Sequence, residues 1–245
     1  MVQLGFSQIA GYMGKHLVIG YSLNFSPALI SPTVFRTTAN TISGYVPDIS
    51  DGVSFNGVNT THVLNLDYVH HRRKAVCLLV QYARTGLNYF SGNSYKYEGS
   101  YAEPVILNSL GIGFGIKLFK RENLAPYGPY VKWEGVMLLN RINYENTKYS
   151  RYDAATDKDI PTKPGSGVID FQTFAIGFSW GRQRIIKDKF VFDRGIRFLV
   201  LPAASNRLNA KDYAPLSSRF ESDGIERIFR QQLINFHIGI GFLAF

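Results

Sequence analysis

The sequence predicts an all-β protein, an eight-stranded antiparallel up-and-down transmembrane β-barrel that forms one domain over residues 1–245. Two observations predict this fold. Eight segments alternate large apolar residues with small or polar ones, and the connections between these segments are alternately long and short. The last segment, NFHIGIGF at 235–242, shows the alternation clearly. A strand with lipid on one side and a narrow, polar interior on the other has this period of two.

The first four predicted strands lie near 15–25, 61–70, 75–88 and 105–119. Their large apolar residues occupy every second position, and the residues expected to face lipid are Leu17, Ile19, Tyr21, Leu23 and Phe25; Leu64, Leu66 and Tyr68; Val76, Leu78, Val80 and Tyr82; and Leu110, Ile112, Phe114, Ile116 and Leu118. The fourth strand has Gly111, Gly113 and Gly115 on its other face, where we expect them to relieve crowding in a narrow lumen.

The other four predicted strands lie near 127–142, 168–181 and 189–202 and at the C-terminus. Their expected lipid-facing residues are Val131, Trp133, Met137 and Leu139; Phe174, Ile176, Phe178 and Trp180; Ile196, Phe198 and Val200; and Phe236, Ile238, Ile240 and Phe242. Each strand is long enough to cross a bilayer at a tilt, which takes ~9–11 residues. The mean hydropathy of −0.07 agrees with a barrel, because only alternate residues face lipid.

The connections predict the orientation of the barrel. Residues 26–60, 89–104, 143–167 and 203–230 are long connections, whereas 71–74, 120–126 and 182–188 are short. Bacterial barrels place short turns in the periplasm and long loops outside. We therefore expect a bacterial outer-membrane protein with both termini in the periplasm. The first eight residues lack the features of a signal peptide, so we expect a mature or truncated chain.

With this pattern the chain resembles the eight-stranded outer-membrane barrels of the OmpA/OmpX type over its whole length. The opening AGYMGK, residues 10–15, is similar to the start of small barrels from Bacteroidota. The resemblance implies a Gram-negative outer membrane and loops exposed at the cell surface.

Positive charge is concentrated at the short connections. The net charge is +9, and eleven cations lie at predicted periplasmic turns or strand ends: Arg72, Arg73, Lys74, Lys120, Arg121, Arg182, Arg184 and Lys187, with Lys15, Lys117 and Lys189. Only Glu122 and Asp188 oppose them there, so this rim accounts for the whole net charge. Such a rim attracts anionic lipid headgroups. Docking of an acidic periplasmic partner or a cell-wall polymer is the alternative, and nucleic acid is disfavoured because an exported barrel rarely meets it.

Charged residues are also expected inside the barrel. We assign Asp67, Lys132, Glu134, Asp170, Asp193 and Arg197 to the inward face. Isolated charges are costly to bury, so these residues should pair in a salt-bridge network that fills the lumen. A proton or ion pathway is the alternative, although eight strands enclose room only for side chains or a very small ligand.

The sequence shows no motif that specifies catalysis, a cofactor or a metal. His62, His70, His71 and His237 have no spacing that predicts metal ligation. The His-X-Ser-Asn run of outer-membrane lipid A deacylases is absent, so we do not expect an enzyme. Cys77, the sole cysteine, is expected to be a small buried side chain. Arg84 and Arg141 suit either lipopolysaccharide phosphates or ordinary snorkelling at the interface.

The first loop, residues 26–60, is the candidate partner-binding segment. It is rich in apolar residues and poor in charge, and Val34, Phe35, Tyr45 and Phe55 are its expected contacts. Such residues are expected to cover the barrel mouth or to bind a partner. The loop at 143–167 predicts a solvated hairpin, and the loop at 203–230 predicts a short amphipathic turn at 225–229.

We therefore expect a non-enzymatic outer-membrane barrel that acts as an interaction or accessory subunit of an outer-membrane protein assembly. Its expected partners are outer-membrane lipids, lipopolysaccharide and other outer-membrane or periplasmic proteins. The alternatives are a stand-alone surface barrel with a structural or adhesion role, a lipid A-modifying enzyme and a small-solute pore.

Overall fold

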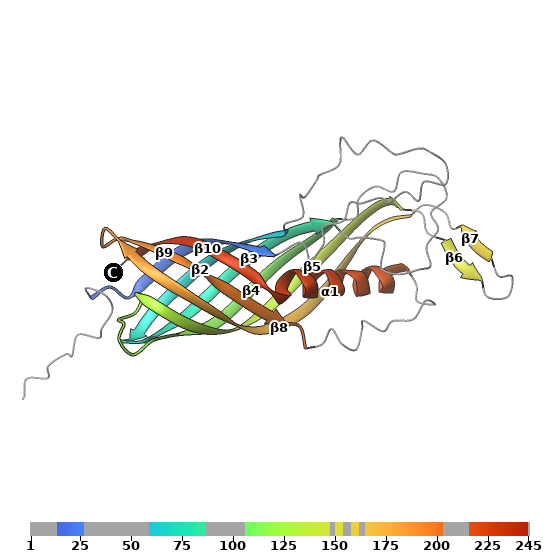
Figure 1. The fold of residues 1–245 in the computed structure, drawn as a ribbon. Coiled ribbons are helices and arrows are strands. Elements are labelled where there is room, and N and C mark those ends of the chain that lie inside the picture. Colours follow the sequence, from blue (N-terminus) through green and yellow to red (C-terminus); the bar gives the residue numbers. More distant parts are fainter. Residues whose placement is uncertain are drawn as a thin grey trace, which may run out of the picture.

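One antiparallel sheet of eight strands closes on itself to form the barrel in Figure 1. The computed structural model describes residues 14–26, 59–86, 106–147, 150–153, 158–161, 165–202 and 216–244. The elements are β1 (Leu17–Ser26), β2 (Asn59–His71), β3 (Lys74–Gly86), β4 (Ile106–Phe119), β5 (Gly128–Thr147), β6 (Ser150–Asp153), β7 (Lys158–Pro161), β8 (Gly165–Ile186), β9 (Phe190–Val200), α1 (Leu216–Leu233) and β10 (Asn235–Ala244).

The order around the barrel is β1-β10-β9-β8-β5-β4-β3-β2, so each barrel strand pairs with its neighbours along the chain. Pairing of β1 with both β2 and β10 closes the ring. This confirms the predicted eight-stranded up-and-down barrel. β6 and β7 form a separate hairpin between β5 and β8, within the segment 143–167 where a hairpin was expected. β5 and β8 extend farther into that segment than predicted.

The two ends of the barrel differ. The short β2–β3, β4–β5 and β8–β9 turns lie at one end with the start of β1 and the end of β10, and we call this the turn end. The other end, the loop end, carries α1 and the β6–β7 hairpin (Figure 1). The turn after β8 is tighter than the predicted connection at 182–188. Lys187 and Asp188 both have positive φ, 51° and 54°, as in the type I′ turns that join twisted strands, so β8 continues to Ile186.

Side chains alternate between the two faces of the sheet as predicted. β3 shows the rule, because every second residue from Ala75 to Thr85 is buried, and the residues between them are exposed except for the half-buried Val76. Large apolar side chains cover the outer face, where Trp180 is 63% exposed, Trp133 59% and Leu64 58%. Among the described residues, no helix is long and apolar enough to cross a membrane.

The interior is built in three layers. A small apolar cluster of Val69, Ala75, Phe119, Ala125 and Tyr130 lies at the turn end, and charged and polar side chains fill the middle. A larger apolar cluster fills the loop end and consists of Val63, Leu79, Leu107, Val136, Leu138, Ile142, Phe171, Ala175, Leu199 and Leu201 with Ile225 and Ile228 of α1.

Helix α1 corrects the expectation of a loop with a short turn at 225–229. The helix has 18 residues and runs from Leu216 to Leu233, and β10 begins at Asn235. The segment is helical because the barrel mouth offers an apolar surface on which one helix face is buried, and most helical stability in proteins comes from such packing.

Candidate functional site

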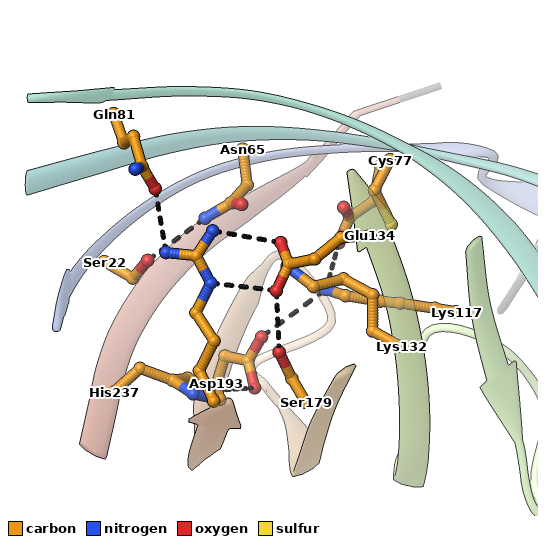
Figure 2. Close-up of polar contacts among 12 residues, drawn as sticks. Ser22, Asn65, Cys77, Gln81, Lys117, Lys132, Glu134, Ser179, Asp193 and His237 are labelled. Atoms are coloured by element: carbon orange, nitrogen blue, oxygen red, sulfur yellow. Dashed lines mark hydrogen bonds and ion pairs between the residues drawn. The ribbon is translucent and has the colours of Figure 1, made fainter. Parts of the chain in front are cut away.

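The central feature of the lumen is the carboxylate of Glu134 on β5. Arg197 of β9 donates two hydrogen bonds to it, from Nε to Oε1 at 2.8 Å and from Nη2 to Oε2 at 3.1 Å. Lys132 Nζ lies 2.9 Å from Oε2, and Ser179 Oγ donates to Oε1 at 3.0 Å. Arg197 Nη1 donates to Gln81 Oε1 on β3 at 2.8 Å (Figure 2). The Glu134 cluster thus connects strands on opposite sides of the barrel.

A second group of contacts surrounds Asp193 on β9. Tyr130 Oη donates to its two oxygens at 2.9 and 3.1 Å, and Gln183 Nε2 donates to Oδ2 at 2.9 Å. Lys117 Nζ lies 3.5 Å from Asp193 Oδ2 and 2.5 Å from Asp67 Oδ2, so it joins the two carboxylates. His237 Nε2 is 3.1 Å from Tyr130 Oη and 3.4 Å from Asp193 Oδ1.

The charges of this central layer balance. Three carboxylates, Asp67, Glu134 and Asp193, meet three cations, Lys117, Lys132 and Arg197. A charge buried away from water is costly unless it is paired and hydrogen-bonded. All six of these charges are paired, and Asp67 Oδ1 is a buried carboxylate oxygen with no hydrogen-bond partner. A cavity of about 20 Å³ lies among them, lined in part by Ser22, Asn24 and Asn65. That volume has room for about one water molecule and for no organic substrate.

Both ends of the lumen are closed by apolar contacts. At the turn end, the β4–β5 turn folds under the barrel, and Ala125 N donates to Arg72 O at 2.9 Å. Ala125 and Phe119 are buried there, and the Phe119 ring lies 5.6 Å from the Tyr130 ring. At the loop end, Ile225 and Ile228 of α1 are buried in the larger apolar cluster. The polar layer is therefore enclosed between two apolar ones.

A polar anchor also holds α1. Arg227 is buried, and its guanidinium donates to Asn59 Oδ1 at 2.8 Å and to Thr85 Oγ1 at 2.9 and 3.1 Å. Asn59 and Thr85 belong to β2 and β3. Gly224 lies one turn before Arg227 on the same side of the helix, and a Cβ there would come within 2.9 Å of Phe171 Cζ on β8. The helix thus lies inside the mouth, in contact with β2, β3 and β8.

The structure brings together five of the six residues predicted to form the lumen network, namely Asp67, Lys132, Glu134, Asp193 and Arg197. Asp170 is the exception and the prediction for it was wrong. Its side chain is 59% exposed on the outer face, where Arg141 binds it through Nε at 2.7 Å and Nη2 at 3.0 Å. The reason is the period of two, because Asp170 lies an even number of residues from the outward Phe174.

Lys117 was also misplaced, in the predicted basic rim. It is 3% exposed and central to the lumen, since it shares the inward face with Gly113 and Gly115. Sequence reasoning also missed Tyr130, Gln81 and Gln183, and counting along each strand would have found them. The contacts of Arg227 could not be found by counting along a strand, because Arg227 lies on α1 and the burial of this helix was not predicted.

The basic rim is an exposed feature of the turn end. Arg72, Lys74, Lys120, Arg121, Arg182, Arg184 and Lys187 are exposed, and Arg73 is half-buried with its Nε 3.4 Å from Phe119 O. The two acids expected among them, Glu122 and Asp188, are exposed as well. Arg194 of β9 is a further exposed cation, on the barrel wall above this rim, that was not predicted from the sequence.

Other predicted features are placed as follows. The partner-binding residues Val34, Phe35, Tyr45 and Phe55 lie outside the described residues, as does most of the AGYMGK opening. Cys77 is buried, and His62 bonds Tyr21 Oη on the outer face at 2.6 Å. Within the described ranges, no group of three His, Cys, Asp or Glu side chains is arranged to hold a metal ion.

The outer face decides the class of the molecule. Every barrel strand presents large apolar side chains outward, and the buried ion pairs of Glu134 with Lys132 and Arg197 lie inside the lumen. A closed ring leaves no strand edge unpaired, which is the condition for crossing lipid as a sheet. The protein is a transmembrane β-barrel. Antiparallel barrels with an even number of strands and this outer band are typical of bacterial outer membranes.

Comparisons with known proteins add three similar structures. Scans against protein-family models and curated proteins find no match. Among solved structures, the transmembrane barrel is similar to Ail, the attachment invasion locus protein of Yersinia pestis, at 10% identity and a TM-score of 0.40, over 93% of this chain and 96% of that one. The N-terminal barrel domain of Pseudomonas aeruginosa OprF has 9% identity and a TM-score of 0.37, over 93% of this chain and 97% of that one. Neisserial surface protein A has 10% identity and a TM-score of 0.36, over 94% of this chain and 95% of that one.

Proposed function

We propose that this barrel is a non-enzymatic, non-conducting protein of the bacterial outer membrane that acts through its ends, as an interaction subunit of an outer-membrane protein assembly. In this arrangement the turn end and both termini face the periplasm, and the loop end faces outward. The observation that carries the proposal is the basic rim at the turn end, exposed around a lumen whose described cavity has a volume of about 20 Å³.

A closed interior supports an interaction role over catalysis or transport. Enzymes and pores need a cleft or a passage, and the cavity among the charged lumen residues has space for about one water molecule. The surface that remains available for binding is at the two ends of the barrel. A cluster of exposed cations attracts an acidic surface from a distance and orients it, which favours specific docking.

The partner we propose is an acidic periplasmic or outer-membrane protein that contacts the turn-end loops. The test is purification of the tagged barrel from native membranes in mild detergent. A rim variant, Arg72→Gln/Lys120→Gln/Lys187→Gln, should lose a stoichiometric partner that the wild type retains at low salt and releases at high salt. A matched variant at the loop end, Arg84→Gln/Arg141→Gln/Arg230→Gln, makes the same charge change and should keep the partner.

The first loop supplies a second arm of the experiment. Phe35→Ala/Tyr45→Ala removes two aromatic side chains of the kind that often dominate binding energy. It should release a partner at the loop end while the folded barrel keeps its heat-dependent gel migration. If neither this variant nor the rim variant changes the composition of the purified sample, the barrel stands alone in the membrane and the proposal fails.

A further inference from the structure

Two arginines lie directly opposite one another on the outer face of the barrel, in the half of β9 that is nearer the turn end. Arg182 of β8 and Arg194 of β9 are register partners in the antiparallel sheet, and both are exposed. Like charges at directly opposed positions destabilise a sheet. An anion bound between the two side chains would relieve this repulsion.

The surroundings on that face supply no anion. The next register partners are Trp180 with Ile196 on one side and Arg184 with Phe192 on the other. Across the neighbouring strands, Arg182 faces Pro129 and Arg194 faces Ile238. The acid nearest in sequence, Asp193, points into the lumen and bonds Tyr130 and Gln183 there. Among the described residues, no carboxylate forms a hydrogen bond or ion pair with Arg182 or Arg194.

The inner face shows how the same arrangement is resolved where acids are present. Lys117 and Lys132 are also register partners, on β4 and β5. Asp67 and Asp193 neutralise the first, and Glu134 neutralises the second. The outer pair has the same geometry without the acids, and it is set among apolar side chains such as the exposed Trp180 and Ile238.

We propose that Arg182 and Arg194 form a binding site for the phosphodiester of an anionic phospholipid, in the membrane leaflet that surrounds the turn end. Guanidinium groups bind phosphate oxygens with paired, charge-assisted hydrogen bonds, and two from adjacent strands can hold one phosphate. The long arginine stems lie along the apolar face while their ends reach the headgroup level. This site is on the barrel wall and uses one residue of the basic rim, Arg182, whereas the protein partner proposed above contacts the turn-end loops.

Reconstitution in vesicles of phosphatidylcholine with increasing phosphatidylglycerol tests the site. The wild type should unfold at higher temperature as phosphatidylglycerol increases, and native mass spectrometry should show a retained lipid. Arg182→Gln/Arg194→Gln should lose most of this gain, with lipid retention about tenfold weaker for each arginine removed. The conservative variant, Arg182→Lys/Arg194→Lys, should fall between the two because lysine keeps the charge but not the paired hydrogen bonds.

Two controls make the outcome specific. Arg84→Gln/Arg141→Gln carries the same charge change at the loop end and should keep the full response to phosphatidylglycerol. Inorganic phosphate added to pure phosphatidylcholine vesicles should not reproduce the gain, and if it does, the site takes free phosphate and the lipid assignment is wrong. Equal responses of the wild type and Arg182→Gln/Arg194→Gln would overturn the site. So would loss of a protein partner by this variant with no change in lipid retention, since the arginines would then form a protein interface.

Discussion

Arg197 and Glu134 form a two-point hydrogen bond across the lumen, although β8 lies between their strands in the sheet. The strands of a barrel are tilted, so side chains from β9 and β5 meet inside it. Lys132, Ser179 and Gln81 complete the contacts of the pair. The side chain of Glu134 is fully buried and forms ion pairs with both Lys132 and Arg197, so the charge balance of the central layer depends on it.

Removal of the Glu134 charge is predicted to destabilise the barrel strongly. Glu134→Gln leaves Arg197 and Lys132 buried without their carboxylate, and breaking a buried pair in this way costs about 3–5 kcal/mol. The temperature at which the folded, fast-migrating form is lost on gels measures the effect. Asp170→Asn is the control, because it breaks the exposed Arg141–Asp170 pair and should leave that temperature unchanged. Equal behaviour of the two variants would contradict the assigned role of the Glu134 cluster.

A second prediction concerns the close approach of Tyr130 to Gly181. The two residues are register partners, and a Cβ at position 181 would lie 2.5 Å from Tyr130 Oη. Gly181→Ala should displace the ring from Asp193 and His237 and lower stability by about 1–3 kcal/mol, as overpacking does. Gly20→Ala is the matched control on the same inner surface, since its new Cβ would have no neighbour nearer than 3.5 Å. Urea titration of both variants distinguishes crowding from a general effect of alanine in a strand.

The purified wild type should show no steady single-channel conductance in planar bilayers. Two apolar clusters close the ends of the lumen, and a balanced ion-pair layer fills the middle. Eight strands enclose a space about wide enough for side chains alone. A sustained open level in the recordings would show that the lumen conducts, and the proposed function would then have to be replaced by a pore.

The orientation in the membrane is predicted to place the hairpin outside and the short turns inside. Lys158→Cys, at the start of β7, should react with an impermeant thiol reagent on intact cells, whereas Arg184→Cys at the turn end should not. Cys77 can remain in both variants because it is buried. The reverse labelling pattern would invert the topology, and permeabilised cells provide the positive control for Arg184→Cys.

The strands and their faces were readable from the chain because alternation is a local property. Leu64, Trp133 and Ile238 lie outward as expected, and the eight strands were found within a few residues of their observed bounds. The errors at Asp170 and Lys117 came from counting along the strand and not from missing information. Each residue shares its face with the neighbours two positions away, and in the structure both residues point to the face that this period predicts.

Other features depended on how the strands close into a ring. The choice of Arg197 as partner for Glu134, and of Asp67 for Lys117, follows from strand tilt and barrel width, which no single segment carries. Helix α1 is a further case. Its Arg227 and Gln231 would be assigned to a solvated face in isolation, yet both are buried because the mouth receives the helix on several sides. Local sequence therefore determines which way a side chain points, while the closed barrel determines what it meets there.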